Sequence, residues 1–167
     1  MEQLEFFWFP RKRPKLTGPK EWKVVALRDC PLKPDRVLCD TPNAVAAYWR
    51  EHIVHHPYFN PDVECFVAIH LDTRRRVTGH HLVGVGIIDS VLVHPREVFR
   101  AAIVAAAHAV IVAHNHPSGD PTPSEADIRT TKNLVQAGQL LRVDLLDHVI
   151  MGTHSHKSLK EMGLLYS

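Results

Sequence analysis

Two histidines, a serine and an aspartate follow one another at a spacing that suits metal chemistry. His114 and His116 are separated by one residue, and Ser124 and Asp127 come shortly after them. On an extended segment, residues two apart project to the same side, so the two imidazoles can share one metal ion. Imidazole nitrogen and carboxylate oxygen are both ligands of zinc. The spacing therefore predicts a metal site made by His114, His116 and Asp127.

Asp127 is expected on the inner face of a helix, because Leu134 and Gly138 share its stripe. A capping box of Thr122 and Glu125 is expected to begin that helix, which leaves Asp127 for another task. A buried carboxylate without a partner is costly, and a cation held by the two histidines would supply the partner. Three protein ligands leave the fourth position of a tetrahedral zinc open for water, which is typical of catalytic sites.

The same residues resemble a known motif. His-x-His, seven residues, Ser, two residues and Asp is similar to the JAMM (MPN+) motif of zinc metallopeptidases, at His114, His116, Ser124 and Asp127. In that family an upstream strand supplies a glutamate that accepts a proton from the attacking water, and Glu64 occupies the matching position by resemblance. The resemblance also implies that Ser124 supports the oxyanion of the tetrahedral intermediate. The structural alternative for Glu64 is a surface carboxylate on an edge strand.

A longer text looks like the bacterial RadC family in particular. It comprises HPREV at 94–98, HNHPSGDPTPSEAD at 114–127 and DHVI at 147–150. The resemblance covers roughly residues 57–165. It implies an α/β fold: a single MPN (JAB)-like domain with a mixed β-sheet sandwiched by helices, in a cytidine-deaminase-like architecture.

Strands that alternate with helices are expected to position these residues. A continuous apolar run at 109–113 predicts a central strand that is covered on both faces and ends at the histidine pair. Further strands are expected at 64–71, from 77 onward and at 144–151, with helices from 41 to about 53, at 94–107 and at 124–141. A short amphipathic piece at 159–165 is expected to follow.

The chain divides into three parts. Residues 1–20 form an extension in which FFWFPRKRPK sets four aromatic residues beside a basic, proline-interrupted run. Residues 21–56 carry an expected edge strand at 22–27 and the first helix, and residues 57–167 form the RadC-like JAMM/MPN domain. Full-length RadC proteins carry an N-terminal helix-hairpin-helix-like region that residues 1–40 do not resemble. A stand-alone or truncated version is therefore expected, and DNA binding inferred from that region does not transfer.

The composition is that of a globular domain, with 45% hydrophobic and 23% charged residues among 167 and a formal net charge of +2. A general polyanion binder would carry a larger basic excess. No apolar run approaches the roughly 20 residues of a membrane span. The three cysteines form no CxxC pair, which argues against a disulfide scaffold and a thiolate zinc site. The first residues lack a secretory signal, so a cytoplasmic location is expected.

The other histidines, from a total of 13, are weaker candidates. His154 and His156 form a second His-x-His, but no acid follows at the matching distance, so they are interpreted as surface residues. The adjacent His80 and His81 are expected to be solvated. His148 is expected either to support a ligand from behind or to be a buried histidine with one hydrogen bond.

These observations predict a zinc-dependent metallopeptidase-like hydrolase of peptide or isopeptide bonds, with Zn²⁺ as cofactor and a peptide or protein as substrate. The alternative is a DNA-repair-associated or mobile-element accessory protein that binds nucleic acid or a protein partner without peptidase turnover. FFWFPRKRPK and the run Arg74, Arg75 and Arg76 favour it through phosphate contacts, and the near-neutral net charge argues against it. A third alternative is a scaffold that keeps zinc without open access to it.

Overall fold

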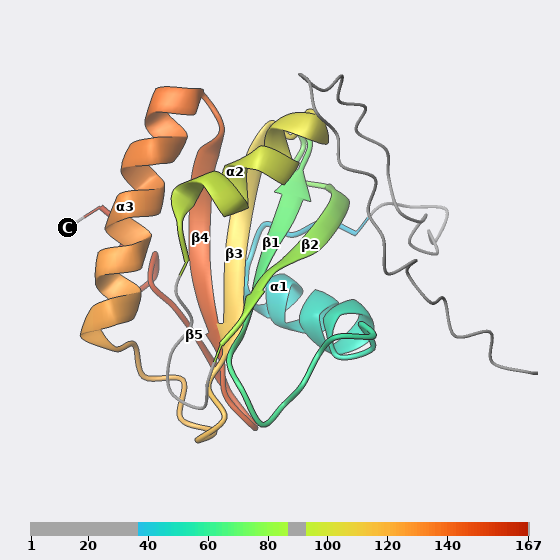
Figure 1. Ribbon diagram of the computed structural model, residues 1–167, viewed down its shortest axis with the longest axis vertical. Helices are drawn as coiled ribbons and strands as arrows, with labels where there is room; N and C mark the ends of the chain where they lie inside the picture. The colour runs from blue at the N-terminus through green and yellow to red at the C-terminus, as the bar shows by residue number, and fades with distance from the viewer. Residues whose placement is uncertain (1–36, 87–92, 167) are drawn as a thin grey trace, which may run out of the picture.

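The computed structural model describes residues 37–86 and 93–166, which form one sheet with helices on both faces (Figure 1). The predicted strand at 22–27 and the FFWFPRKRPK segment lie outside the described residues. In chain order the elements are α1 (Pro42–Tyr48), a π-helical segment η1 (Trp49–Ile53), β1 (Cys65–Leu71), β2 (Val77–Val85), α2 (Pro95–Val104), β3 (Ala109–Asn115), α3 (Glu125–Leu141), β4 (Asp144–Met151) and β5 (His156–Ser158).

The sheet is mixed, with the strand order β2-β1-β3-β4-β5. β3 and β4 pair in parallel, and the other neighbouring strands pair antiparallel. A parallel pair needs a crossover connection, and α3 provides it between β3 and β4. Phe66 near the start of β1 pairs with His114 near the end of β3. The residues just before β1 and just after β3 therefore meet at one end of the sheet.

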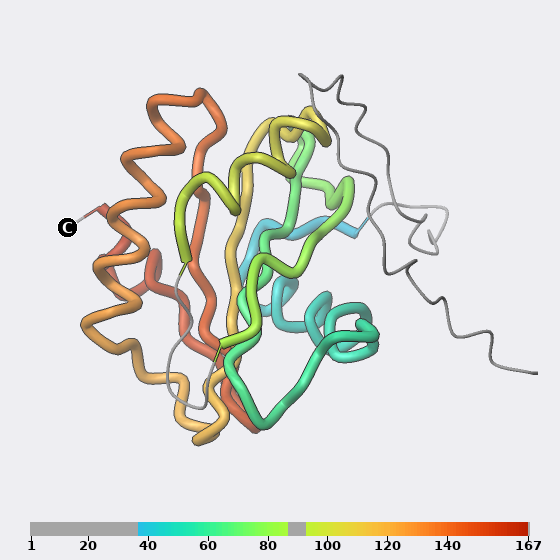
Figure 2. Tube along the Cα trace, in the orientation of Figure 1, coloured from blue at the N-terminus to red at the C-terminus, as the bar shows by residue number. Residues whose placement is uncertain are grey.

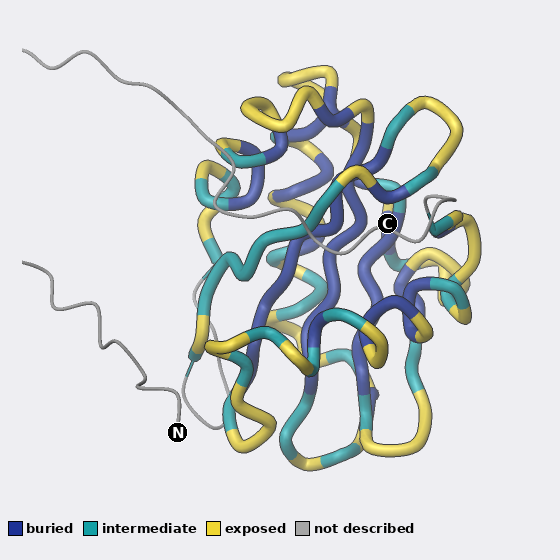
Figure 3. The backbone as a smooth tube through the Cα atoms, turned by 90° about the vertical axis from the view of Figure 1, so that its right-hand side faces the viewer, coloured by how far each residue is buried: buried dark blue, intermediate teal, exposed yellow. Residues whose placement is uncertain are grey.

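The sheet separates two apolar cores, as the alternation of strand side chains requires. Ile111 and Ala113 of β3 pack with α1 and η1, whereas Val110 and Val112 pack with α2 and α3. All seven residues of β3 and all seven of β1 are buried, and buried backbone forms the dark blue centre of Figure 3. The predicted α/β fold, with a mixed sheet between helices, is confirmed.

Local signals set two of the helix boundaries. Thr41 begins α1 because its side chain accepts the N–H of Ala44, with proline at the first helical position as expected. α2 ends at Val104 rather than at the predicted residue 107. There Ala106 takes a left-handed backbone conformation with φ of 49°, which stops the helix.

The C-terminal segment differs from the prediction. A three-residue strand, β5, pairs with the end of β4, and residues 159–165 form turns rather than regular structure. Leu159 and Leu165 are nevertheless buried, at 0% and 1% exposure. The amphipathic pattern of residues 159–165 therefore predicted the burial of these leucines, although not the secondary structure. None of the helices in the described part of the chain has the length and hydropathy of a membrane span.

Candidate metal centre

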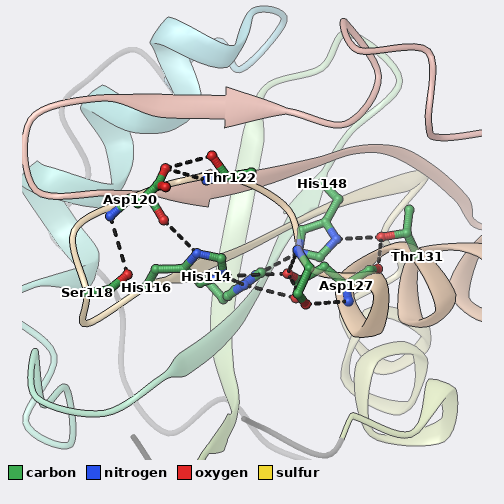
Figure 4. A network of polar contacts seen from close by, with 9 residues as sticks. His114, His116, Ser118, Asp120, Thr122, Asp127, Thr131 and His148 are labelled. Atoms are coloured by element: carbon green, nitrogen blue, oxygen red, sulfur yellow. Dashed lines mark hydrogen bonds and ion pairs between the residues drawn. The ribbon is translucent and has the colours of Figure 1, made fainter. Parts of the chain in front are cut away.

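The end of β3 brings two imidazoles together. His114 lies on the strand with 1% of its surface exposed, and the half-buried His116 follows the strand. Their Nε2 atoms are 3.0 Å apart, because residues two apart on an extended chain share one side. Both rings therefore present a nitrogen to the same point (Figure 4).

Asp127, in the first turn of α3, completes a three-residue group. Its Oδ1 lies 3.2 Å from His114 Nε2, and its Oδ2 lies 3.5 Å from His116 Nε2. Burial by itself would raise the pKa of the Asp127 carboxyl, but its contacts with the rings of His114 and His116 and its hydrogen bond from Ser124 hold that pKa well below its usual range. The hydrogen bond to Asp127 in turn raises the pKa of His116. The group therefore favours an anionic carboxylate beside a cation.

The capping box at the start of α3 consists of other residues than predicted. Ser124, not Thr122, caps the helix: its Oγ accepts the N–H of Asp127 at 3.1 Å. Asp127 Oδ2 accepts the N–H and the O–H of Ser124, both at 2.7 Å. Thr122 instead donates its hydroxyl to Asp120, and Glu125 is exposed. Asp127 thus completes the capping box with Ser124 and also faces the two histidines.

Glu64 lies directly before β1 at the same end of the sheet. It is 8% exposed, and β1 lies between β2 and β3, so the alternative of an exposed edge-strand carboxylate is wrong. One ligand atom each of Glu64, His114 and His116 lie within 4.8 Å of one another, a grouping that can hold a metal ion. The histidine pair thus has two carboxylates beside it, from β1 and from α3.

Asn115 lies between the two histidines in sequence, and its side chain contacts the backbone around Glu64. Its Oδ1 accepts the N–H of Cys65 at 2.9 Å, and its Nδ2 donates to the carbonyl of Val63 at 3.0 Å. One amide side chain therefore binds the residue before and the residue after Glu64. Sequence reasoning assigned Asn115 no role, because the pairing partner of its strand was unknown.

A loop after β3 orients His116. The ring donates its Nδ1–H to the backbone carbonyl of Asp120 at 2.8 Å, which leaves Nε2 for the site. The N–H of His116 donates to Met151 at the end of β4, and the N–H of Thr153 donates to the carbonyl of Gly119. Figure 2 shows this loop and the turn after β4 side by side below the sheet. The loop is therefore held by the neighbouring strand.

Two buried side chains lie behind His114. His148 on β4 is 0% exposed, and its Nε2 lies 2.8 Å from His114 Nδ1. Its Nδ1 lies 2.6 Å from Thr131 Oγ1 of α3, so His148 makes two ring contacts instead of one. Burial, followed by the charge of His114, keeps the pKa of His148 well below its ordinary value. Thr131 was missed, although it lies one turn after Asp127 on the predicted inner stripe.

Other histidines are not part of this group. His80 and His81 are hydrogen-bonded rather than solvated: His80 Nδ1 lies 2.7 Å from the hydroxyl of Tyr48, and His81 Nδ1 lies 3.0 Å from Nε2 of His70. His154, in the second His-x-His, is exposed. No other cluster of His, Cys, Asp or Glu in the described ranges is spaced to hold a metal ion.

A family model described as the RadC-like JAB domain matches residues 39–164 of this chain. The chain belongs to the RadC-like JAB domain family. The matched range of this JAB domain includes Glu64, both site histidines, Ser124 and Asp127, together with the supporting residues described above.

Several curated relatives carry the name UPF0758 protein. The one from Moorella thermoacetica is 51% identical over 104 residues, which is 62% of this chain and 45% of the relative. The one from Desulforamulus reducens is 46% identical over 104 residues, covering 62% and 46%. The one from Symbiobacterium thermophilum is 44% identical over 128 residues, covering 77% and 52%. This chain thus spans about half the length of the curated relatives it matches.

Proposed function

We propose that this chain is a zinc-dependent hydrolase of peptide or isopeptide bonds, with His114, His116 and Asp127 as the zinc ligands. The spacing of the donor atoms supports this most directly. Zinc bonds of 2.0–2.1 Å in a tetrahedral arrangement separate neighbouring ligands by about 3.3–3.4 Å. The two histidine Nε2 atoms lie 3.0 Å apart, one oxygen of Asp127 lies 3.2 Å from His114, and its other oxygen lies 3.5 Å from His116. These separations are close to those that zinc requires.

Glu64 is the proposed general base. A bound zinc supplies Lewis acidity, which makes water acidic near neutral pH and polarises a scissile carbonyl. Glu64 accepts the proton of the attacking water and delivers it to the leaving amine. Its place beside the ligand atoms of His114 and His116 supports this role, and so does the Asn115 amide that holds its backbone on both sides.

Ser124 is proposed to stabilise the oxyanion of the tetrahedral intermediate. Its single hydroxyl proton is donated to Asp127 Oδ2 at 2.7 Å, so the O–H must turn toward the substrate to take this role. The contact with Asp127 also orients one of the proposed ligands. In the structure Ser124 therefore acts as a helix cap, and the proposed role in the reaction requires its hydroxyl to rotate.

The metal content of the purified chain tests the ligand assignment. Elemental analysis is expected to find about one zinc per chain in the native protein and in Glu64→Gln, because Glu64 is not a proposed ligand. Asp127→Ala should lose the zinc. The absence of stoichiometric metal from the native chain, even after zinc is offered, would refute the proposed function.

Hydrolysis of a quenched-fluorescence peptide library and of isopeptide-linked substrates tests the reaction. The native chain loaded with zinc should cleave members of these sets, whereas Glu64→Gln should bind zinc and cleave none. Full activity in the glutamine variant would exclude Glu64 as the base. Stoichiometric zinc with no cleavage of any substrate would favour a zinc-binding scaffold.

Nucleic-acid binding is the competing proposal. In the described part of the chain, Arg74 and Arg75 are exposed in the turn between β1 and β2. That turn lies at the far end of β1 from Glu64, so phosphates bound there would not reach the histidine pair. Retention of the chain on immobilised DNA, measured against salt concentration, separates the two proposals. Loss of retention near physiological salt would remove the competing one.

A further inference from the structure

A buried row of hydrogen bonds connects His114 to the helix that carries Asp127. His114 Nδ1 lies 2.8 Å from His148 Nε2, and His148 Nδ1 lies 2.6 Å from Thr131 Oγ1. Thr131 Oγ1 in turn lies 2.6 Å from the backbone carbonyl oxygen of Asp127. Figure 4 shows this row running from the histidine pair back to α3. The row therefore joins β3, β4 and α3 behind the site.

The direction of every hydrogen bond in the row follows from Thr131. Thr131 Oγ1 donates to the carbonyl oxygen of Asp127 in the structure, and this uses the one proton of its hydroxyl. Thr131 Oγ1 must then accept the proton on Nδ1 of His148. Because a neutral imidazole carries one proton, His148 Nε2 is left as an acceptor for the Nδ1–H of His114. The remaining lone pair of His114 is on Nε2, which faces His116 and Asp127.

The surroundings of the two rings leave few other arrangements. His148 and Thr131 are both 0% exposed, so their polar atoms form hydrogen bonds within the row and not with water. The ring of Phe66 stacks on His114 at 5.7 Å and meets His148 edge-on at 5.4 Å, which restricts rotation of both imidazoles. Rotation of the rings therefore offers no alternative to this assignment of the protons.

We propose that Thr131 and His148 are positioning residues, which fix His114 in the tautomer whose Nε2 lone pair faces the metal. This inference rests on the metal site of the proposed function and adds how the tautomer of one ligand, His114, is fixed. His116 is prepared differently, by a backbone carbonyl that can never act as a donor. For His114 the direction depends on a side-chain hydroxyl, which a single substitution can remove.

Without the hydroxyl of Thr131, the direction of the hydrogen bond between His148 and His114 is expected to reverse. In Thr131→Val, which keeps the shape of threonine, Nδ1 of His148 loses its acceptor. The proton of His148 then moves to Nε2, and that of His114 moves to its own Nε2, where Asp127 Oδ1 at 3.2 Å accepts it. A proton on this nitrogen blocks the lone pair that a metal needs.

The test compares three variants in the metal-free and the zinc-loaded chain. Thr131→Val removes the hydroxyl, whereas Thr131→Ser keeps the hydroxyl and removes the methyl group. The control, Thr130→Val, is the same threonine-to-valine substitution at the adjacent residue, which lies about 100° around the helix. Long-range ¹H–¹⁵N correlation spectra of the histidine rings, recorded above the pH at which histidine titrates, report which nitrogen is protonated. Competition with a chromophoric chelator gives the zinc affinity.

The native chain, Thr131→Ser and Thr130→Val should all show His114 and His148 protonated on Nδ1. Thr131→Val should show His114 protonated on Nε2 and bind zinc about 10- to 100-fold more weakly. Loss of affinity in both Thr131→Val and Thr131→Ser would indicate packing and overturn the proposal. So would native tautomers in Thr131→Val, or Nε2 protonation in the native metal-free chain.

These outcomes separate the inference from the proposed function. If the native chain binds zinc but cleaves nothing, the affinity and tautomer comparisons still decide the roles of Thr131 and His148. If the native chain binds no zinc, the proposed function fails, and the metal-free spectra alone decide whether the hydroxyl of Thr131 sets the tautomer of His114. Should Thr131→Val fail to fold, the spectrum of the native chain remains decisive.

Discussion

Asn115 lies between the two site histidines in sequence, and its amide bonds the backbone on both sides of Glu64. Replacing it with alanine leaves the N–H of Cys65 and the carbonyl of Val63 without these partners. We expect Asn115→Ala to lower the free energy of unfolding of the metal-free chain by about 2–4 kcal/mol. Losing the partner of a buried group such as the N–H of Cys65 costs about 1–3 kcal/mol, and the half-buried carbonyl of Val63 adds a smaller cost. Urea denaturation measures this change.

The matched control is Asn133→Ala, which removes the same side chain from an exposed position on α3. Its unfolding midpoint should stay close to that of the native chain. Equal destabilisation by the two substitutions would mean that the amide of Asn115 does not stabilise the backbone beside Glu64.

At the residue scale, spacing predicted which side chains meet but not how they share protons. Ser124 and Asp127 come together as expected, yet the capping box formed two residues later than predicted. Thr122 with Glu125 and Ser124 with Asp127 are both acceptable pairs, so local sequence could not choose between them. Thr122 was excluded as the cap by its own contact with Asp120, which depends on the loop conformation.

Among the elements, the contact between the loop after β3 and the turn after β4 leaves no room for a side chain at Gly152. A Cβ there would lie 2.3 Å from the carbonyl oxygen of Gly119 and 2.8 Å from Cδ of Pro121. Gly152→Ala should push the loop away and move the Asp120 carbonyl that orients His116. We expect zinc affinity, measured by chelator competition, to fall about 10-fold.

Gly79→Ala is the control for this substitution. Gly79 lies on β2, and a Cβ added there meets nothing within 4 Å. It should leave zinc affinity unchanged. Native affinity in Gly152→Ala would show that the loop can move without disturbing His116.

Long or strongly patterned elements were predictable, and short ones were not. The continuous apolar run of β3 and the limits of β4 matched the structure because burial on both faces leaves a clear signal. β5 has three residues and its pairing is set by β4, so its sequence carries no periodicity of its own. The contact of Asn115 with β1 was equally hidden, since it depends on the register between two strands.

For the whole molecule, buried histidines make folding stability depend on pH. Burial, followed by the nearby His81 and His80, lowers the pKa of His70 from 6.5 to about 4. Between these values the unfolded chain binds a proton that the folded chain does not, so stability falls as the pH drops from about 6.5 to 4. The contribution of His70 is about 3 kcal/mol over that range.

Urea denaturation of the metal-free chain at a series of pH values tests this dependence. His70→Gln cannot titrate at this position, so its stability should fall less than that of the native chain as the pH drops through the same window. His108→Gln, at an exposed position, is the control and should follow the native curve. Parallel curves for the native chain and His70→Gln would contradict the assignment to His70.

His114 and Asp127 stand at the two ends of one loop, and a metal ion held by both would close that loop into a ring. A protease cut inside residues 117–123 would then leave two fragments tied by the ion, and a chelator would release the constraint. We expect the nicked, zinc-loaded chain to resist further digestion and the chelated chain to be degraded. Gel electrophoresis of timed digests would show the metal acting as a reversible cross-link between the central strand and its crossover helix.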